Sequence, residues 1–203
     1  LALKGVDGLA ARVGARPPGL APPVISAWAR VALVLLGLRF RRVGAPMRHP
    51  GALVANHASW IDIVTLQRAA AVFFVSKAEV AGWPGIGLIG KGICTVFIER
   101  RAAEAKRQNA VIGDRLRRGD RLCLFPEGTS TDGRRVLPFK SSLFEAFFEP
   151  DTRGLAWVQP VSIAYHPEAG LPASFYGWWG DMDFGAHLLA VLARSRSGVV
   201  EAT

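Results

Sequence analysis

The chain has 203 residues, half of them apolar, and its 25 basic and 16 acidic side chains give a formal net charge of +9. A mean hydropathy of +0.24 is high for a freely soluble protein, and the length fits one domain of ordinary size. A basic, apolar chain suits a membrane surface, where anionic lipids attract Lys and Arg. Nucleic acid is the other common partner of basic chains, but we do not expect it because no stacking motif, zinc-ligand spacing or basic recognition helix occurs.

The segment before residue 50 predicts a linker followed by a helix. Residues 14–23 are rich in Pro and Gly, and the apolar run Val24–Leu38 is followed by Arg39, Arg41 and Arg42. The run has 15 residues, interrupted by one arginine, and is too short to span a bilayer, which needs about 20. Two alternatives remain open: a helix in the membrane interface with its arginines at headgroup level, or a core helix packed on the domain.

From Gly51 onward, short β-branched and aromatic runs alternate with helical stretches. The runs predict strands at Ala52–Ala55, Val72–Ser76, Cys94–Ile98, Arg121–Phe125 and Ala156–Ala164, and the chain ends in a strand-like run. The stretches between them predict helices at Trp60–Ala69, Ala102–Arg118, Ser141–Phe148 and Ala186–Arg194. This alternation predicts an α/β fold with a mixed, mostly parallel central sheet flanked by helices. In such sheets ligands bind at the carboxyl ends of the strands.

The two cysteines, Cys94 and Cys123, each lie within a predicted strand. Free Cys behaves as a small hydrophobe, so we expect buried, reduced thiols, which favour the cytosol. A disulfide between neighbouring strands is the alternative.

The first candidate site, Asn56-His57-Ala58-Ser59-Trp60-Ile61-Asp62, directly follows a predicted strand. Imidazole can take a proton from an alcohol near neutral pH, and a carboxylate on its other nitrogen fixes the tautomer. Five residues along one helix rotate by about 500°, so the two side chains can meet only if His57 lies in the turn and Asp62 in the first helical turn. The alternative is a helix cap, because Ser59 and Asp62 are spaced as in a capping box.

A second candidate site, Phe125-Pro126-Glu127-Gly128-Thr129-Ser130-Thr131-Asp132-Gly133, also follows a predicted strand. Proline and glycine favour a turn whose backbone N–H groups can bind a phosphate or another anion. An ordinary turn with Asp132 and Gly133 at its tip is the alternative. We expect both candidate sites to open on the same edge of the sheet, where the carboxyl ends of parallel strands meet.

Two further segments carry notable residues within or after a strand. In Val96-Phe97-Ile98-Glu99-Arg100-Arg101 an arginine could clamp a phosphate, with a structural ion pair to a nearby Glu as the alternative. The basic face of the following helix is interpreted as a solvated surface rather than a specific binding site. In Val158-Gln159-Pro160-Val161 a proline within an apolar strand indicates an edge strand or a bulge.

Together these four segments resemble the motifs of the glycerolipid acyltransferase family typified by lysophosphatidate acyltransferase. The family's His-x4-Asp motif corresponds to His57 and Asp62. Its Phe-Ile-x-Arg, Phe-Pro-Glu-Gly-Thr and proline-containing blocks correspond, in the same order, to Phe97–Arg100, Phe125–Thr129 and Val158–Val161. Ser76-Lys77-Ala78-Glu79 also resembles the family's Lys-x-Glu segment, and the resemblance covers roughly residues 50 to 165.

The resemblance implies an O-acyltransferase that moves a fatty acyl chain from acyl-CoA or acyl-ACP to the free hydroxyl of a lysolipid. It implies His57 as general base and Asp62 as its orienting acid, as in a serine protease triad whose serine is replaced by the substrate hydroxyl. Backbone N–H groups near the loops would stabilise the oxyanion. No metal or other cofactor is implied. Five further residues are implied to hold the acceptor headgroup: Lys77, Arg100, Glu127, Gly128 and Thr129.

The resemblance implies two acceptors. Lysophosphatidate (1-acyl-glycerol-3-phosphate), which would give phosphatidic acid, is our first expectation. Many family members with phosphate-bearing acceptors carry arginine directly after Pro-Glu-Gly-Thr, whereas this chain has Ser130. The segment Tyr176-Gly177-Trp178-Trp179-Gly180-Asp181-Met182 resembles members that acylate lyso-ornithine lipid, whose acceptor is a 3-hydroxyacyl group on an amino acid. Lyso-ornithine lipid, which would give ornithine lipid, is therefore a close second.

With this resemblance, we expect residues 1–45 to form a helical membrane-associating segment with its Pro/Gly linker, and residues 46–203 an acyltransferase domain. The expected location is the cytoplasmic face of the inner (plasma) membrane, with peripheral or monotopic attachment to an anionic surface. The alternative of another class is a non-catalytic basic module that binds anionic lipid through Arg39, Arg41, Arg42 and the basic helix.

Overall fold

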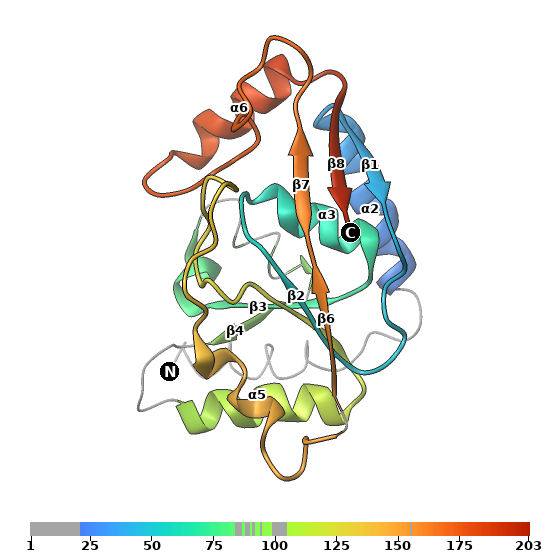
Figure 1. Ribbon diagram of the computed structural model, residues 1–203, viewed down its shortest axis with the longest axis vertical. Coiled ribbons are helices and arrows are strands. Elements are labelled where there is room, and N and C mark those ends of the chain that lie inside the picture. Colours follow the sequence, from blue (N-terminus) through green and yellow to red (C-terminus); the bar gives the residue numbers. More distant parts are fainter. Residues whose placement is uncertain are drawn as a thin grey trace, which may run out of the picture.

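A parallel five-stranded sheet lies at the centre of the computed structural model (Figure 1). The structure describes residues 21–83, 87, 90, 92–93, 95–98, 105–154 and 156–203. The strand order is β4-β3-β5-β2-β6, and each neighbouring pair is parallel. The strands are β2 (Gly51–Ala55), β3 (Phe73–Lys77), β4 (Val96–Ile98), β5 (Arg121–Leu124) and β6 (Trp157–Val161). The predicted α/β fold with a parallel central sheet is confirmed.

Helices cover both faces of this sheet. Because successive side chains of a strand point to opposite faces, each central strand contributes to two cores. In β2, Leu53 belongs to the core that contains α2 (Ala21–Leu35) and α3 (Ile61–Ala69). Its neighbour Ala52 belongs to the second core, against α5 (Ala105–Arg117). Burial on both faces explains why the central strands are continuous apolar runs in the sequence.

A second sheet of three strands, ordered β1-β8-β7, packs beside the central one. Strand β1 (Leu38–Arg42) is parallel to β8 (Gly198–Ala202), and β7 (Ile163–His166) is antiparallel to β8. Helix α6 (Phe184–Arg194) connects the upper end of β7 to β8 (Figure 1). Residues of α2, β1 and β8 share one core with α3, and the domain division at residue 45 stays a prediction.

The helix predicted for Val24–Leu38 ends earlier, at Leu35. Gly37 has φ +67°, and a Cβ atom on it would lie 2.5 Å from the carbonyl oxygen of Ser195. Glycine is therefore required where the chain leaves the helix and enters β1. The three arginines expected at a helix end lie instead on β1, and Arg41 forms an ion pair with β8.

The single strand predicted for Ala156–Ala164 is two strands, β6 and β7, which belong to different sheets. The side chain of Asn56 marks the division, since its Nδ2 donates to Ile163 O at 3.0 Å and its Oδ1 accepts from Ile163 N at 2.7 Å. An amide side chain offers the same donor and acceptor as a strand backbone. The backbone of Ser162 forms hydrogen bonds with that of Thr203, the residue after β8. At this point the chain leaves the central sheet and joins the second sheet beside β8.

The helix predicted for Ser141–Phe148 is two short 3-10 turns, Ser141–Leu143 and Glu145–Phe147. The N–H groups of this segment bond to carbonyls three residues earlier, as in Phe144 N to Ser141 O. Pro150 follows closely, and proline disfavours helical conformation in the residue before it.

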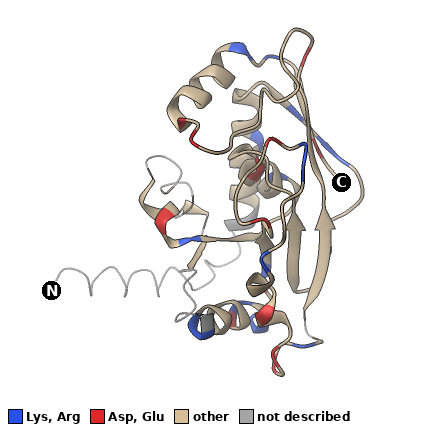
Figure 2. Ribbon diagram, turned by 60° about the vertical axis from the view of Figure 1, so that its left-hand side comes forward, with Lys and Arg blue, Asp and Glu red and all other residues tan. Residues whose placement is uncertain are grey.

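Helix α5 carries several ion pairs on its predicted basic face. Figure 2 marks the basic positions of the chain in blue and the acidic positions in red. Arg115 lies 3.2 Å from Asp120, and Arg117 pairs with both Asp114 and Asp151. Acidic neighbours therefore neutralise part of the charge that this helix would present to an anionic partner.

Cys123 is fully buried and not in a disulfide, as expected, and burial raises the pKa of its thiol. None of the helices within the described ranges has the length and apolar character needed to cross a membrane. Several residues singled out in the sequence lie outside the described part of the chain: Cys94, Glu99, Arg100 and Arg101.

Candidate active site

His57 lies at the carboxyl end of β2, in the loop that connects this strand to α3. Strand β2 is flanked by β5 and β6, so its end is fixed on both sides. The Asn56 side chain adds two hydrogen bonds to Ile163. The imidazole is thus carried by a rigid part of the fold, at the sheet edge where α/β proteins bind ligands.

The predicted meeting of His57 and Asp62 is confirmed. His57 Nδ1 lies 2.7 Å from Asp62 Oδ2, and the Asp62 side chain is completely buried whereas that of His57 is 18% exposed. Asp62 stands in the first turn of α3. Because a carboxylate can only accept, Nδ1 carries the proton in this pair and Nε2 keeps the lone pair that a general base needs.

Asp62 accepts three other hydrogen bonds. Its Oδ2 atom also accepts from the backbone N–H groups of Ala58 (2.7 Å) and Ser59 (2.9 Å), and its Oδ1 atom accepts from the Tyr165 hydroxyl at 2.5 Å. Burial and the negative charge of Asp62 raise the pKa of Tyr165, so the phenol stays protonated and donates. Sequence reasoning missed Tyr165, which follows a predicted strand and belongs to no local motif.

The loop after β5 packs directly on His57, as expected for two loops at one sheet edge. The ring of Phe125 stacks on the imidazole, with centroids 3.9 Å apart and an interplanar angle of 13°. Thr131 N donates to His57 O at 2.9 Å. Gly128 adopts φ +76°, a conformation that glycine tolerates without a steric penalty, and lines the same cavity as His57.

Glu127 is buried, with its carboxylate turned toward backbone N–H groups. Its Oε2 accepts from Leu137 N at 2.8 Å, and its Oε1 accepts from His57 N at 3.4 Å. The side chain therefore links the loop that carries His57 to the segment that follows the second candidate loop. Glu127 does not line the cavity beside His57, in contrast to its loop neighbours Gly128 and Thr129.

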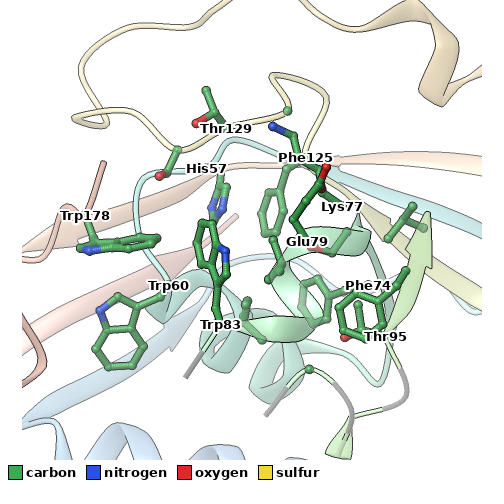
Figure 3. A pocket seen from close by; sticks show the side chains of 18 residues that line it. His57, Trp60, Phe74, Lys77, Glu79, Trp83, Thr95, Phe125, Thr129 and Trp178 are labelled. Carbon is green, nitrogen blue, oxygen red and sulfur yellow. The ribbon is translucent and has the colours of Figure 1, made fainter. Parts of the chain in front are cut away.

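A cavity of about 340 Å³ opens beside His57. Aromatic and aliphatic side chains form most of its wall, including Trp60, Phe74 and Trp83. Figure 3 shows Trp60 and Trp178 on one side of His57, and Phe74 and Thr95 on the other. Its polar lining comes from the two candidate loops, from β3 and the turn after it, and from the residue before β4: His57, Ser76, Lys77, Glu79, Thr95, Thr129 and Ser130.

The tryptophan wall of the cavity is anchored by the C-terminal segment. Trp178 N donates to Ala58 O at 2.8 Å, which ties this segment to the loop that carries His57. Trp60 Nε1 donates to His187 Nδ1 at 3.0 Å, and His187 Nε2 donates to Phe175 O at 3.3 Å. Burial lowers the pKa of His187, which favours this neutral tautomer.

Comparisons with known proteins show which family this chain resembles in sequence. An acyltransferase family model matches residues 39–164, which is more than half of the chain. The chain is 47% identical over 190 residues to the lyso-ornithine lipid O-acyltransferase of Rhodobacter capsulatus, covering 93% of this chain and 67% of that protein. It is 33% identical over 172 residues to the 1-acyl-sn-glycerol-3-phosphate acyltransferase of Neisseria gonorrhoeae, covering 83% and 63%.

A solved structure has the same fold. The crystal structure of the 1-acyl-sn-glycerophosphate (LPA) acyltransferase PlsC from Thermotoga maritima superposes with a TM-score of 0.59 at 21% identity, covering 90% of this chain and 67% of that chain. The chain spans about two thirds of the length of these three proteins.

Proposed function

Because this chain belongs to the acyltransferase family, we propose that it transfers a fatty acyl chain from an acyl thioester to the free hydroxyl of a lysolipid. The observation that carries this proposal is the 2.7 Å bond between His57 Nδ1 and the buried Asp62, at the wall of a mainly apolar cavity. A histidine held in this way can accept a proton from a hydroxyl, and the apolar wall suits acyl chains.

The reaction follows from the two nitrogen atoms of His57. Nε2 takes the proton of the acceptor hydroxyl as its oxygen attacks the thioester carbonyl, while Asp62 stabilises the imidazolium through Nδ1. The C–S bond then breaks, and the imidazolium returns the proton to the leaving thiolate. The nucleophile is the substrate itself, so no acyl-enzyme forms, and the acyl donor is the only co-substrate that the reaction requires.

We propose that the acceptor headgroup binds at the polar part of the cavity wall. Lys77, Gly128 and Thr129 line the cavity and can contact it, and the backbone of the loop after β5 can stabilise the oxyanion. Glu127 acts on the headgroup indirectly, by holding the loop through its bond to Leu137. Arg100 remains a proposed headgroup ligand on the family resemblance, since it lies outside the described residues.

Lyso-ornithine lipid is the acceptor that we propose, which reverses the order expected from sequence. Identity is higher to the lyso-ornithine lipid acyltransferase of Rhodobacter capsulatus, at 47%, than to the 1-acyl-sn-glycerol-3-phosphate acyltransferase of Neisseria gonorrhoeae, at 33%. Ser130 lines the cavity proposed for the acceptor, and this position, where many phosphate-accepting members carry arginine, is uncharged here. Lysophosphatidate is the second candidate.

Helix α2 supports attachment to a membrane surface. One face packs into the core through Ala29 and Leu33. The opposite face exposes five large apolar side chains, Val24, Trp28, Val31, Val34 and Leu35. The structure therefore shows the core packing that was one of the two alternatives from sequence, and we propose that the exposed face lies in the interface of an anionic membrane. The cytoplasmic face of the inner membrane is the proposed site, because it presents anionic lipid and keeps thiols reduced.

Product formation from an acyl thioester tests the function. Purified protein is incubated with labelled acyl-CoA or acyl-ACP and with lyso-ornithine lipid or lysophosphatidate, and the acylated lipid is quantified. We expect transfer by the wild type and loss of at least about 10²-fold in His57→Ala, since general base catalysis contributes roughly 10²–10⁴-fold.

His49→Ala is the matched control, because His49 is exposed and stacks on Trp157 outside the cavity. It should keep wild-type activity. A non-catalytic lipid-binding module would form no product with either donor, and a His57→Ala variant with wild-type activity would exclude the proposed mechanism.

A further inference from the structure

The hydrogen bonds of Asp62 divide unequally between its two oxygen atoms. Oδ2 accepts from His57 Nδ1, Ala58 N and Ser59 N, all of which belong to one local turn. Oδ1 accepts from the hydroxyl of Tyr165, which lies 103 residues away in the other sheet. The second oxygen is therefore held by a separate element of the fold.

We infer that Tyr165 is a positioning residue for acyl transfer, whose hydroxyl fixes the Asp62 carboxylate that orients His57. This inference rests on the function proposed above. The χ2 torsion of aspartate is broad, so hydrogen bonds rather than rotamer preference decide where the carboxylate points. A donor on Oδ1 keeps the carboxylate from rotating, and Oδ2 stays aimed at Nδ1 of the imidazole.

The placement of Tyr165 suits this role. It stands in the middle of β7, in register with Val200 of β8, so a rigid strand delivers the hydroxyl. Supporting groups on regular elements hold a site more closely than groups on loops. The phenol is fixed further by the neighbouring ring of Tyr176, at a centroid distance of 5.7 Å.

Tyr176 provides a matched control. It is a second tyrosine in the same cluster and is fully buried, but its hydroxyl bonds to Ser195 Oγ (2.7 Å) and Glu168 Oε2 (3.1 Å) instead of Asp62. Removing the Tyr165 hydroxyl costs one side-chain hydrogen bond, and removing the Tyr176 hydroxyl costs two. Only the Tyr165 hydroxyl touches the carboxylate that orients the base.

The test compares Tyr165→Phe with Tyr176→Phe in steady-state kinetics. We expect Tyr165→Phe to lower kcat about tenfold, a fraction of the roughly 10²–10⁴-fold that general base catalysis contributes, with KM for the lysolipid nearly unchanged. Tyr176→Phe should keep the wild-type kcat. In the Asp62→Asn background, Tyr165→Phe should cost nothing further, because it acts through Asp62. An unchanged kcat, an equal loss in Tyr176→Phe, or an additive loss in the double variant would overturn the inference.

A spectroscopic readout separates this inference from the proposed function. The Nδ1 proton of His57 is followed by NMR in protein labelled with ¹⁵N at histidine. Its resonance should move in Tyr165→Phe and stay in place in Tyr176→Phe. If the wild type acylates neither lysolipid, the proposed function fails. An unmoved Nδ1 resonance in Tyr165→Phe refutes the positioning role, whatever the result of the activity assay.

Discussion

The hydrogen bonds of Asp62 fit both roles that the sequence presented as alternatives, a helix cap and the proposed orienting acid. Its Oδ2 atom accepts from Ser59 N, as the acid of a capping box does, and the same atom accepts from His57 Nδ1. The backbone N–H groups that a cap must satisfy also hold the carboxylate in place for the imidazole. Capping and orientation of the base are therefore one arrangement of atoms.

Asp62→Asn should separate the two roles, because asparagine caps a helix about as well as aspartate but cannot stabilise an imidazolium. The neutral amide removes the negative charge that stabilises the imidazolium formed during proton transfer. We expect kcat to fall by roughly 10⁴-fold, as in a protease triad, while the thermal midpoint changes little. Asp183→Asn is the control, since Asp183 caps α6 by accepting from Ala186 N at 2.7 Å. Wild-type kcat in Asp62→Asn would leave Asp62 with a capping role only.

Ser130→Arg should change which acceptor is preferred. Ser130 lines the cavity, and an arginine there can bind a phosphate monoester bidentately. We expect kcat/KM for lysophosphatidate to rise about tenfold relative to that for lyso-ornithine lipid, since a hydrogen bond to a charged group contributes about 1.5–3 kcal/mol. Ser142→Arg adds the same charge on an exposed turn away from the cavity and should leave the ratio unchanged. An unchanged ratio in Ser130→Arg would show that this position does not select the acceptor.

Among the elements, those that depend on local sequence were predicted best. The strand before His57 and the turn that brings Asp62 back to it lie within 12 consecutive residues, Gly51–Asp62, so pattern and spacing were sufficient. Strand β7 was not separated from β6, because the division depends on bonds from Asn56 and Thr203, far away in the chain. Tyr165 was missed for the same reason.

Helix α2 is the element whose exposed surface can be tested. Val34 is 68% exposed on its outer face, and Leu189 on α6 is exposed to nearly the same extent, at 67%. If the outer face of α2 enters the interface, Val34→Glu should weaken binding to vesicles containing anionic lipid about tenfold, since burying a Val side chain contributes about 1.5–3 kcal/mol. Leu189→Glu, measured by the same flotation assay, should bind as the wild type does. Equal binding by Val34→Glu would remove α2 from the membrane contact.

At the scale of the whole molecule, the site depends on two sheets and the C-terminal segment meeting around His57. The central sheet supplies the two loops, β7 supplies Tyr165, and the segment before α6 supplies Trp178. The acyltransferase family model ends at residue 164, just before the last two contributions. No motif quoted for the resemblance includes Tyr165, and the segment with Trp178 bore only on the choice of acceptor. The sequence therefore implied roles for His57 and Asp62 but none for these supporting residues.

The bond between Trp60 and His187 joins α3 to the C-terminal segment and makes the stability of the molecule depend on pH. Burial lowers the pKa of His187 from its ordinary value of 6.5, so the unfolded chain binds a proton more readily than the folded one. This contribution to stability is therefore fully present above about pH 6.5 and is lost as the pH falls toward the folded-state pKa.

Thermal midpoints should drop between about pH 7 and pH 5. The drop should be less steep in His187→Gln, whose amide oxygen can accept from Trp60 without titrating. Glu168, Glu201 and Asp132 also have lowered pKa values, but their ordinary values of 3.8 to 4.5 put their contributions below this range. His49→Gln, at an exposed histidine, should keep the wild-type slope, and an equally steep slope in His187→Gln would contradict the link.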